Sequence, residues 1–234
     1  MSSIVIVAAE VRELAGVSRF AEARPLRWPL DYSGVIESEG TRLLLVANGA
    51  GARNAALAVE AAAGRDAVDA VVSTGYCGGL DPALRAGEVF VAREVRDLAG
   101  GERYAVQMPV TSRSCATGVL VTSDRVVCTS EEKRRLNQTT GASAVDMEAA
   151  AVAAQAARRG LPFFCVRVVS DTADESFAWD LNAMRDSEGR FQRGRILRET
   201  CRRPLVMVPE LVRLYRRSRM ASGNLGEFLA SCRF

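Results

Sequence analysis

The chain has 234 residues, 48% of them apolar and 25% charged, with a formal net charge of +3 and no histidine. This length and composition are typical of one folded α/β domain and exclude a disordered chain, and no apolar run is long enough to predict a transmembrane helix. The absence of histidine excludes Ser-His-Asp and Cys-His nucleophile systems and the usual zinc and non-haem iron sites, so proton transfer must use carboxylates, tyrosine, cysteine, the single lysine or water.

The predicted elements begin with a strand at residues 4–8. The N-terminus lacks the basic start of a signal peptide and soon meets charged residues, so we also expect a cytoplasmic protein. Apolar runs predict five more strands, and Ala-rich runs predict two helices, the second closed by Gly160 and Pro162. In chain order these elements are a strand at 43–47, a helix at 52–63, strands at 68–73, 88–95 and 119–122, a helix at 142–159 and a strand at 163–169.

This alternation continues as far as residue 170 and predicts an α/β layer fold with a largely parallel sheet. In such sheets, ligands bind beyond the carboxyl ends of the strands. The segments that we expect at this edge are residues 10–13, 48–54, 74–79 and 170–174.

The chain changes character after residue 175. Between Arg190 and Arg219 it carries ten arginines and two glutamates, a local excess of eight positive charges on an otherwise mildly acidic chain. Apolar residues from Leu205 to Tyr215 recur at helical spacing, which predicts a basic amphipathic helix. Such a helix either docks on the protein with solvated arginines or lies on an anionic membrane. Because aromatic residues are not interleaved with the arginines, we expect no nucleic acid partner.

Two glycine-rich segments follow predicted strands. The first, from Gly49 to Asn54, lacks the third glycine of a dinucleotide-binding fingerprint, so a tight turn between a strand and a helix is the better interpretation. The second, from Thr74 to Leu80, is predicted to be a loop. Its glycines either let the backbone pass close to a flat ligand or supply positive φ angles.

Acidic residues stand at two further places. Asp146 and Glu148 flank Met147 at the start of the second predicted helix, where they either complement the helix dipole or bind a vicinal diol. Ser170 and Asp171 follow a largely apolar strand, where Asp171 either caps a turn or acts as a proton donor.

Three of these segments together resemble the purine nucleoside phosphorylase superfamily. They are TG-x-x-GGL at residues 74–80, V-x-MEAAA at 145–151 and VRVVSDTAD at 166–174. Over residues 4–175 the chain is most similar to the methylthioadenosine and S-adenosylhomocysteine nucleosidases. The resemblance implies a single domain over residues 1–234, with three αβα layers around a mixed, largely parallel twisted sheet and a divergent basic helical extension at about 176–234. It also implies a homo-oligomer, a dimer or larger.

The resemblance implies a role for each residue at a matching position. Asp171 would protonate or hydrogen-bond N7 of a departing purine, and Glu13, with Glu10 as the alternative, would activate the attacking water. The implied substrate-binding residues are Tyr76, Cys77, Gly78, Val126, Val127, Met147, Glu148 and Ser170. Cleavage of an N-glycosidic bond passes through an oxocarbenium-like sugar that carboxylates stabilise, so the reaction needs neither a metal nor a cofactor.

The chain departs from the resemblance at the second glycine segment. The nucleosidases have a serine where this chain has Tyr76, and the hexameric phosphorylases have an arginine and a serine at the positions of Ser73 and Tyr76. The loss of both residues weakens the case for phosphate as a co-substrate at this turn, and leaves Arg53 or an arginine of a partner chain as the alternative phosphate ligand. We therefore expect hydrolysis of an adenosine-type nucleoside, with two alternatives: phosphorolysis giving ribose 1-phosphate, and a non-catalytic nucleoside-binding protein.

The end of the chain is similar to another branch. Segments 177–182, 185–191 and 224–229 resemble hopanoid-associated phosphorylase-like proteins, which are linked to the removal of adenine from adenosylhopane. This resemblance implies a lipid-linked nucleoside as substrate. It is consistent with a basic helix that contacts the inner face of a membrane peripherally.

Overall fold

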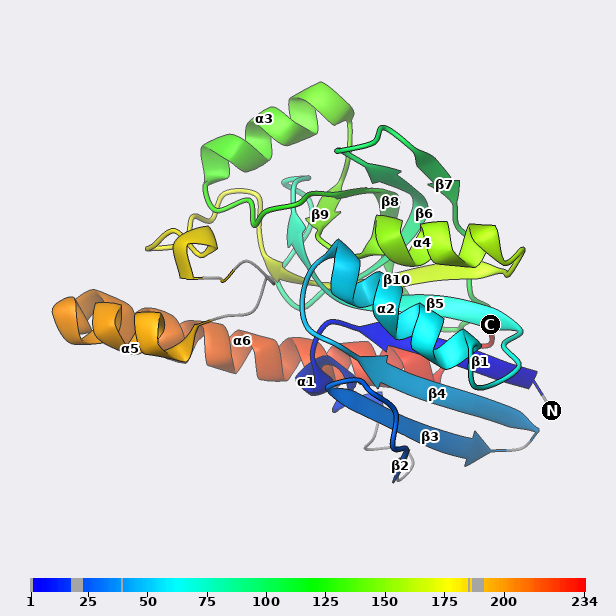
Figure 1. Cartoon of the computed structure of the whole chain (residues 1–234). Helices are drawn as coiled ribbons and strands as arrows, with labels where there is room; N and C mark the ends of the chain where they lie inside the picture. Colours follow the sequence, from blue (N-terminus) through cyan, green and yellow to red (C-terminus); the bar gives the residue numbers. More distant parts are fainter. Residues whose placement is uncertain (1, 18–22, 39, 185, 187–191) are drawn as a thin grey trace.

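The computed structural model describes the chain except residues 1, 18–22, 39, 185 and 187–191. Its core is a ten-stranded sheet, drawn in Figure 1. The strands are β1 (Ser2–Ala8), β2 (Arg24–Pro25), β3 (Tyr32–Ser38), β4 (Thr41–Ala47), β5 (Ala70–Gly79), β6 (Val89–Asp97), β7 (Arg103–Ala105), β8 (Ala116–Thr122), β9 (Ala144–Asp146) and β10 (Phe163–Asp171). The helices are α1 (Val11–Leu14), α2 (Ala52–Ala63), α3 (Ser130–Thr140), α4 (Ala149–Arg158), α5 (Arg193–Arg202) and α6 (Pro204–Ala230), with a short 3-10 helix at Asn182–Met184.

Parallel strands form the middle of the sheet. Strands β4, β1, β5 and β10 lie side by side in this order, and the pairings between them are all parallel. Antiparallel strands β3 and β2 extend one side. On the other side β5, β9, β8, β6 and β10 pair in a ring, because β10 pairs with both β5 and β6. The predicted mixed α/β fold is confirmed.

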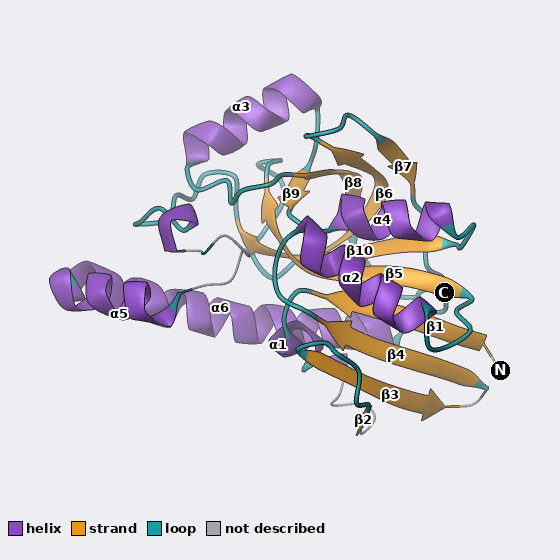
Figure 2. Cartoon of the chain, in the orientation of Figure 1, coloured by secondary structure: helices purple, strands orange, loops and turns teal. Residues whose placement is uncertain are grey.

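Helices cover both faces of this sheet. Successive side chains of a strand point to opposite faces, and on β1 Val5 and Val7 join one apolar cluster while Ile4 and Ile6 join another. The first cluster includes residues of α2 and α4, and the second includes residues of α1 and of the C-terminal half of α6. In Figure 2, α2 and α4 accordingly lie in front of the sheet and α6 runs behind it.

Two predicted elements differ from the structure. The helix expected at 142–159 begins only at Ala149, because residues 144–146 form β9 and pair with β5 and β8. These tertiary pairings override the helix propensity of an Ala-rich segment. The prediction of a loop from Thr74 to Leu80 is also wrong for residues 74–79. Strand β5 continues to Gly79 and pairs there with β10 and β9.

The basic end of the chain forms α5 and α6. The C-terminal half of α6 packs on the sheet through Ala221, Leu225 and Phe228, whereas α5 and the start of α6 extend beyond the sheet in Figure 1. Within the described residues, no helix is long and apolar enough to cross a membrane. The second resemblance depended in part on residues 185–191. All of these except residue 186 lie outside the described residues.

Candidate active site

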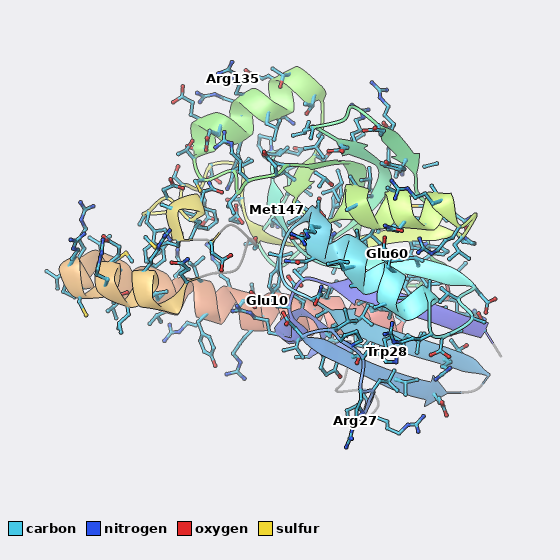
Figure 3. All side chains as sticks on the ribbon, in the orientation of Figure 1. Glu10, Arg27, Trp28, Glu60, Arg135 and Met147 are labelled. Atoms are coloured by element: carbon cyan, nitrogen blue, oxygen red, sulfur yellow. The ribbon has the colours of Figure 1, made fainter. Side chains whose placement is uncertain are left out.

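One cavity of about 290 Å³ is lined by all eleven residues that we expected to form the site. It lies where the parallel strands β1, β5 and β10 end and where α4 begins. Glu10 and Met147, labelled in Figure 3, stand at the start of α1 and just before α4 and belong to its wall. Segments far apart in the sequence therefore meet at the carboxyl edge of the parallel strands, where ligands bind in such folds.

Glu13 is a buried acid in α1, the short helix that follows β1. Its Oε2 accepts hydrogen bonds from the backbone N–H of Ala9, at 2.8 Å, and of Glu10, at 3.0 Å. Burial, and to a lesser degree the nearby charge of Glu148, raises the pKa of Glu13 to about 7. Glu10 instead is partly exposed and pairs with Arg12. Of the two candidate bases, the geometry favours Glu13, because a base works best when its pKa lies near the working pH.

Glu148 precedes α4 and faces the same cavity. Its Oε1 accepts a hydrogen bond from the backbone N–H of Gly51 at 2.8 Å. The first glycine segment thus forms a turn that holds a carboxylate of the site, and Gly49 and Gly51 have φ angles of 89° and 102° there. Burial, followed by repulsion from Asp146, raises the pKa of Glu148. The remaining acceptor capacity of this carboxylate suits the two neighbouring hydroxyls of a ribose.

Asp146 and Arg167 form a fully buried ion pair under the site. The Nη2 of Arg167 donates to Asp146 Oδ2 at 2.5 Å and to Ser73 Oγ at 2.8 Å. Asp146 Oδ2 also accepts the backbone N–H of Ala149 at 2.8 Å, so the pair fixes the start of α4 beside Glu148. Our sequence reasoning placed Asp146 in the first turn of the helix and missed Arg167. The available signal was an arginine within an otherwise apolar strand.

Gly75 lies against both Arg167 and Glu13. A Cβ at this position would come within 3.1 Å of Arg167 Nη1 and within 3.1 Å of the Glu13 carboxyl group, and the φ angle of Gly75 is 134°. Only glycine therefore lets β5 pass between these two side chains. The guanidinium and the candidate base consequently face the same small region of the site.

Asp171 is the last residue of β10 and is 6% exposed. Its Oδ1 accepts a hydrogen bond from Ser170 Oγ at 2.5 Å, and its Oδ2 lies 2.5 Å from Nζ of Lys133. A Cβ on Gly78 would lie 3.3 Å from Asp171 Oδ2. The glycines at the end of β5 therefore allow close packing against Asp171. Sequence reasoning did not connect Lys133 with this acid.

Tyr76 joins the site to the C-terminal helix. Its hydroxyl lies 2.6 Å from Ser222 Oγ and donates to the backbone carbonyl of Ser218 at 3.2 Å, both in α6. Burial raises the pKa of Tyr76, so its phenol stays protonated. Leu214 of α6 also lines the cavity. The C-terminal helix, which sequence reasoning treated as an extension, is thus part of the wall of the site.

A second hollow of about 820 Å³ adjoins the first, and Glu10, Tyr76, Ser170 and Leu214 belong to both linings. Among the residues that line only this hollow, the apolar and aromatic ones come mainly from the segment 179–184 and from α6, and they include Tyr32, Trp179, Met184, Leu211 and Tyr215. Asp31, Arg217 and Ser218 form a polar part of the same wall.

The described residues contain no group of three His, Cys, Asp or Glu side chains that could hold a metal ion. Burial raises the pKa of the Cys77 thiol well above its usual range, so this cysteine stays protonated and is a poor nucleophile. The carboxyl groups of Glu10, Glu13, Glu148 and Asp171 line the same cavity.

Comparisons with known proteins show what this chain is similar to in sequence and in fold. A 5′-methylthioadenosine/S-adenosylhomocysteine nucleosidase of Staphylococcus aureus is 27% identical over 169 residues, which cover 61% of this chain and 73% of the relative. A nucleosidase of the same name from Neisseria meningitidis, solved with methylthio-immucillin-A, is similar in fold, with a TM-score of 0.74, 22% identity and coverage of 99% and 98% of the two chains. The futalosine hydrolase of Helicobacter pylori is similar with a TM-score of 0.73, 18% identity and coverage of 98% and 96%.

The model of the phosphorylase superfamily matches residues 4–113 and 102–193, a span that contains every candidate site residue. Since this match covers most of the chain, and the fold and the cavity agree with it, the protein belongs to the phosphorylase superfamily.

Proposed function

We propose that the protein is an N-ribosyl hydrolase that cleaves the glycosidic bond of an adenosine-type nucleoside and releases the purine base. The observation that carries this proposal is the meeting of three carboxyl groups in one cavity, those of Glu13 and Asp171, which are buried, and that of Glu148, which is partly buried. The reaction develops positive charge on the sugar and negative charge on the base. Acids placed on both sides of the scissile bond can stabilise both changes.

Asp171 acts on the leaving group. When the bond between C1′ and N9 breaks, its electron pair goes to the purine, and a proton from Asp171 to N7 makes the base neutral. Ser170 fixes the carboxyl group through its 2.5 Å hydrogen bond to Oδ1. A correctly held acid of this kind typically contributes about 10²- to 10⁴-fold to the rate.

Glu148 and Glu13 act on the sugar and on the nucleophile. Glu148 accepts hydrogen bonds from the ribose hydroxyls and faces the cationic sugar in the transition state. Glu13 takes a proton from a water molecule, whose oxygen forms the new bond to C1′. The pKa of about 7 that burial gives Glu13 suits a base at neutral pH. The proton on Glu13 then exchanges with solvent, and Asp171 regains its own proton from solvent.

Hydrolysis is favoured over phosphorolysis by the charges around the nucleophile. Phosphate would need a cation beside the nucleophile, whereas Arg12 pairs with Glu10 and Arg167 pairs with Asp146. Phosphorolysis would then depend on Arg53, which is exposed in the first turn of α2, or on an arginine of a partner chain. Several carboxylates would also repel a dianion. The test is release of adenine from adenosine in buffer with and without phosphate. Hydrolysis predicts equal rates and free ribose, whereas strict phosphate dependence with ribose 1-phosphate as product would contradict it.

A long apolar 5′ substituent is the finer part of the proposal. The larger hollow, with Trp179, Met184 and Leu211 in its wall, supports a lipid-linked nucleoside such as the adenosylhopane that the second resemblance implies. Adenosines with 5′-alkylthio groups of increasing length test this point. We expect KM to fall as the chain lengthens from methyl to octyl, and a KM that rises with length would contradict the proposal.

Peripheral membrane contact is proposed for the same region, in an otherwise cytoplasmic protein. Leu205 is 90% exposed, and Val206, Val208 and Val212 are exposed beside it in the arginine-rich helix α6. Flotation with anionic liposomes tests this contact against a Leu205→Ser/Val208→Ser variant. Equal flotation of both proteins would refute it.

A homo-oligomer is likewise proposed, and the mass of the protein in solution measures it directly.

A further inference from the structure

Lys133 is the only lysine of the chain and is 0% exposed. It lies in the first turn of α3, and its side chain reaches under the loop that follows β10. Its Nζ lies 2.5 Å from Asp171 Oδ2 and donates to the backbone carbonyls of Thr172, at 2.7 Å, and Glu175, at 2.9 Å. The ring of Phe177 lies 5.6 Å from the same nitrogen. A buried cation thus contacts the acid that we assign to the leaving group.

The number of acceptors matches the charged form of this lysine. An ammonium group has three N–H donors, and Lys133 has one acceptor for each of them in Asp171, Thr172 and Glu175. A neutral amine has only two N–H bonds, so it would leave one of these acceptors without a donor. The three acceptors therefore match an ammonium group, which stays beside Asp171 both before and after Asp171 gives up its proton.

The elements around Lys133 hold it in place. Thr129 and Glu132 form a capping box that fixes the first turn of α3. The loop after β10 is tied to this turn, because the backbone N–H of Phe177 donates to the carbonyl of Cys128 at 2.9 Å. On its other side, Glu175 pairs with Arg217 of α6 at 2.6 Å. The ammonium group therefore has little freedom to move away from Asp171.

We propose that Lys133 is a positioning residue that acts through Asp171, an inference that rests on the proposed function. When the O–H bond of Asp171 breaks and the N–H bond at purine N7 forms, the carboxyl group becomes a buried carboxylate. A buried carboxylate without a partner is costly, and the ammonium group at 2.5 Å supplies that partner. Because the cation is already fixed before the reaction, it stabilises the charge that develops on Asp171 without rearrangement.

Two base analogues separate this role from a merely structural one. In 9-methyladenine, N7 carries a lone pair and resembles the base before cleavage. In 9-deazaadenine, N7 carries a hydrogen and resembles the protonated base, so it pairs with Asp171 as a carboxylate. Lys133→Met removes the charge at similar length. We expect calorimetry to show a loss of about tenfold or more in affinity for 9-deazaadenine, and a much smaller loss for 9-methyladenine.

Two further variants complete this experiment. Arg134→Met removes the neighbouring cation, whose side chain is exposed on the same helix, and should leave both affinities unchanged. In an Asp171→Asn background, Lys133→Met should no longer distinguish the two bases, because the residue through which it acts is absent. Equal losses for the two bases in the Lys133→Met protein, or no loss for either, would overturn the inference.

The wild-type protein gives a second readout that needs no variant. Lysine labelled with ¹⁵N at Nζ yields one side-chain signal, since the chain has one lysine. We expect an ammonium signal at pH 7 that shifts more with 9-deazaadenine than with 9-methyladenine, and a neutral-amine signal or equal shifts would overturn the inference. Failure of the wild type to bind either base would instead overturn the proposed function, and the role of Lys133 with it.

Discussion

Replacing Glu13 by glutamine should make the protein more stable at alkaline pH while it removes activity. The carboxyl group of Glu13 is buried, and burial raises its pKa from 4.5 to about 7. The folded protein therefore binds this proton more tightly than the unfolded chain does. The resulting stabilisation is complete below about pH 4.5 and is lost as the pH rises through 7.

The expected magnitude follows from this pKa. A rise from 4.5 to about 7 corresponds to about 3 kcal/mol of folding free energy that the wild type loses by pH 8. Glutamine has no charge to bury, and its carbonyl oxygen can accept both backbone hydrogen bonds that Oε2 accepts from Ala9 and Glu10. Its NH2 group would then face the backbone N–H of Tyr76, which donates to Oε1 of Glu13 at 3.4 Å, and the loss of this acceptor costs about 1 kcal/mol. Glu13→Gln should thus be about 2 kcal/mol more stable than the wild type at pH 8.

Urea unfolding at pH 8 and pH 5 measures this difference. At pH 5 most of the advantage should disappear, because Glu13 of the folded wild type is then largely protonated. Adenine release by Glu13→Gln should fall about 10²- to 10⁴-fold at pH 7, and the wild-type rate should fall as the pH drops below 7. Two results would refute the reasoning. One is a variant that is less stable than the wild type at pH 8, and the other is an equal difference in unfolding free energy between variant and wild type at both pH values.

Three other substitutions test the scaffold around the site. Arg167→Met should cost about 3 to 5 kcal/mol in unfolding free energy, because it leaves the buried carboxylate of Asp146 without its cation, and a loss below about 1 kcal/mol would contradict this assignment. Gly16→Ala should loosen the packing of α6, because the added Cβ would lie 2.0 Å from the carbonyl oxygen of Ser222. We expect faster proteolysis of α6 in this variant, and an unchanged rate of proteolysis would argue against tight packing there. Tyr76→Phe removes the hydrogen bonds to α6 and should cost about 1 kcal/mol in unfolding free energy, while turnover changes less than about threefold. Turnover slowed by about two orders of magnitude would mean that the phenol takes part in the chemistry.

Most of the central sheet and the choice of site residues could be predicted from the sequence. Apolar runs located β1, β4 and β10, and the acids that follow β1 and β10 lie at the carboxyl edge because parallel strands end together there. The helix expected from residue 142 failed because an Ala-rich composition cannot reveal that β5 and β8 capture residues 144–146. Helix α3 was missed although Thr129 and Glu132 carry the spacing of a capping box.

The contacts that tune the site could not be predicted in the same way. Nothing local connects Lys133 with Asp171, or Arg167 with Asp146, because each pair is brought together only by the packing of distant elements. The wall that α6 contributes through Leu214 depends on how the C-terminal helix crosses the sheet. Local patterns identified the reactive groups, whereas their partners depend on the tertiary structure.

The most direct measurement compares adenine release from adenosine by the wild type and by Asp171→Asn, together with the binding of 9-methyladenine to both. We predict that turnover falls about 10²- to 10⁴-fold in the variant while its affinity for 9-methyladenine changes little. An Asp171→Asn protein that releases adenine at the wild-type rate would contradict the assignment of Asp171 as the proton donor to the departing base.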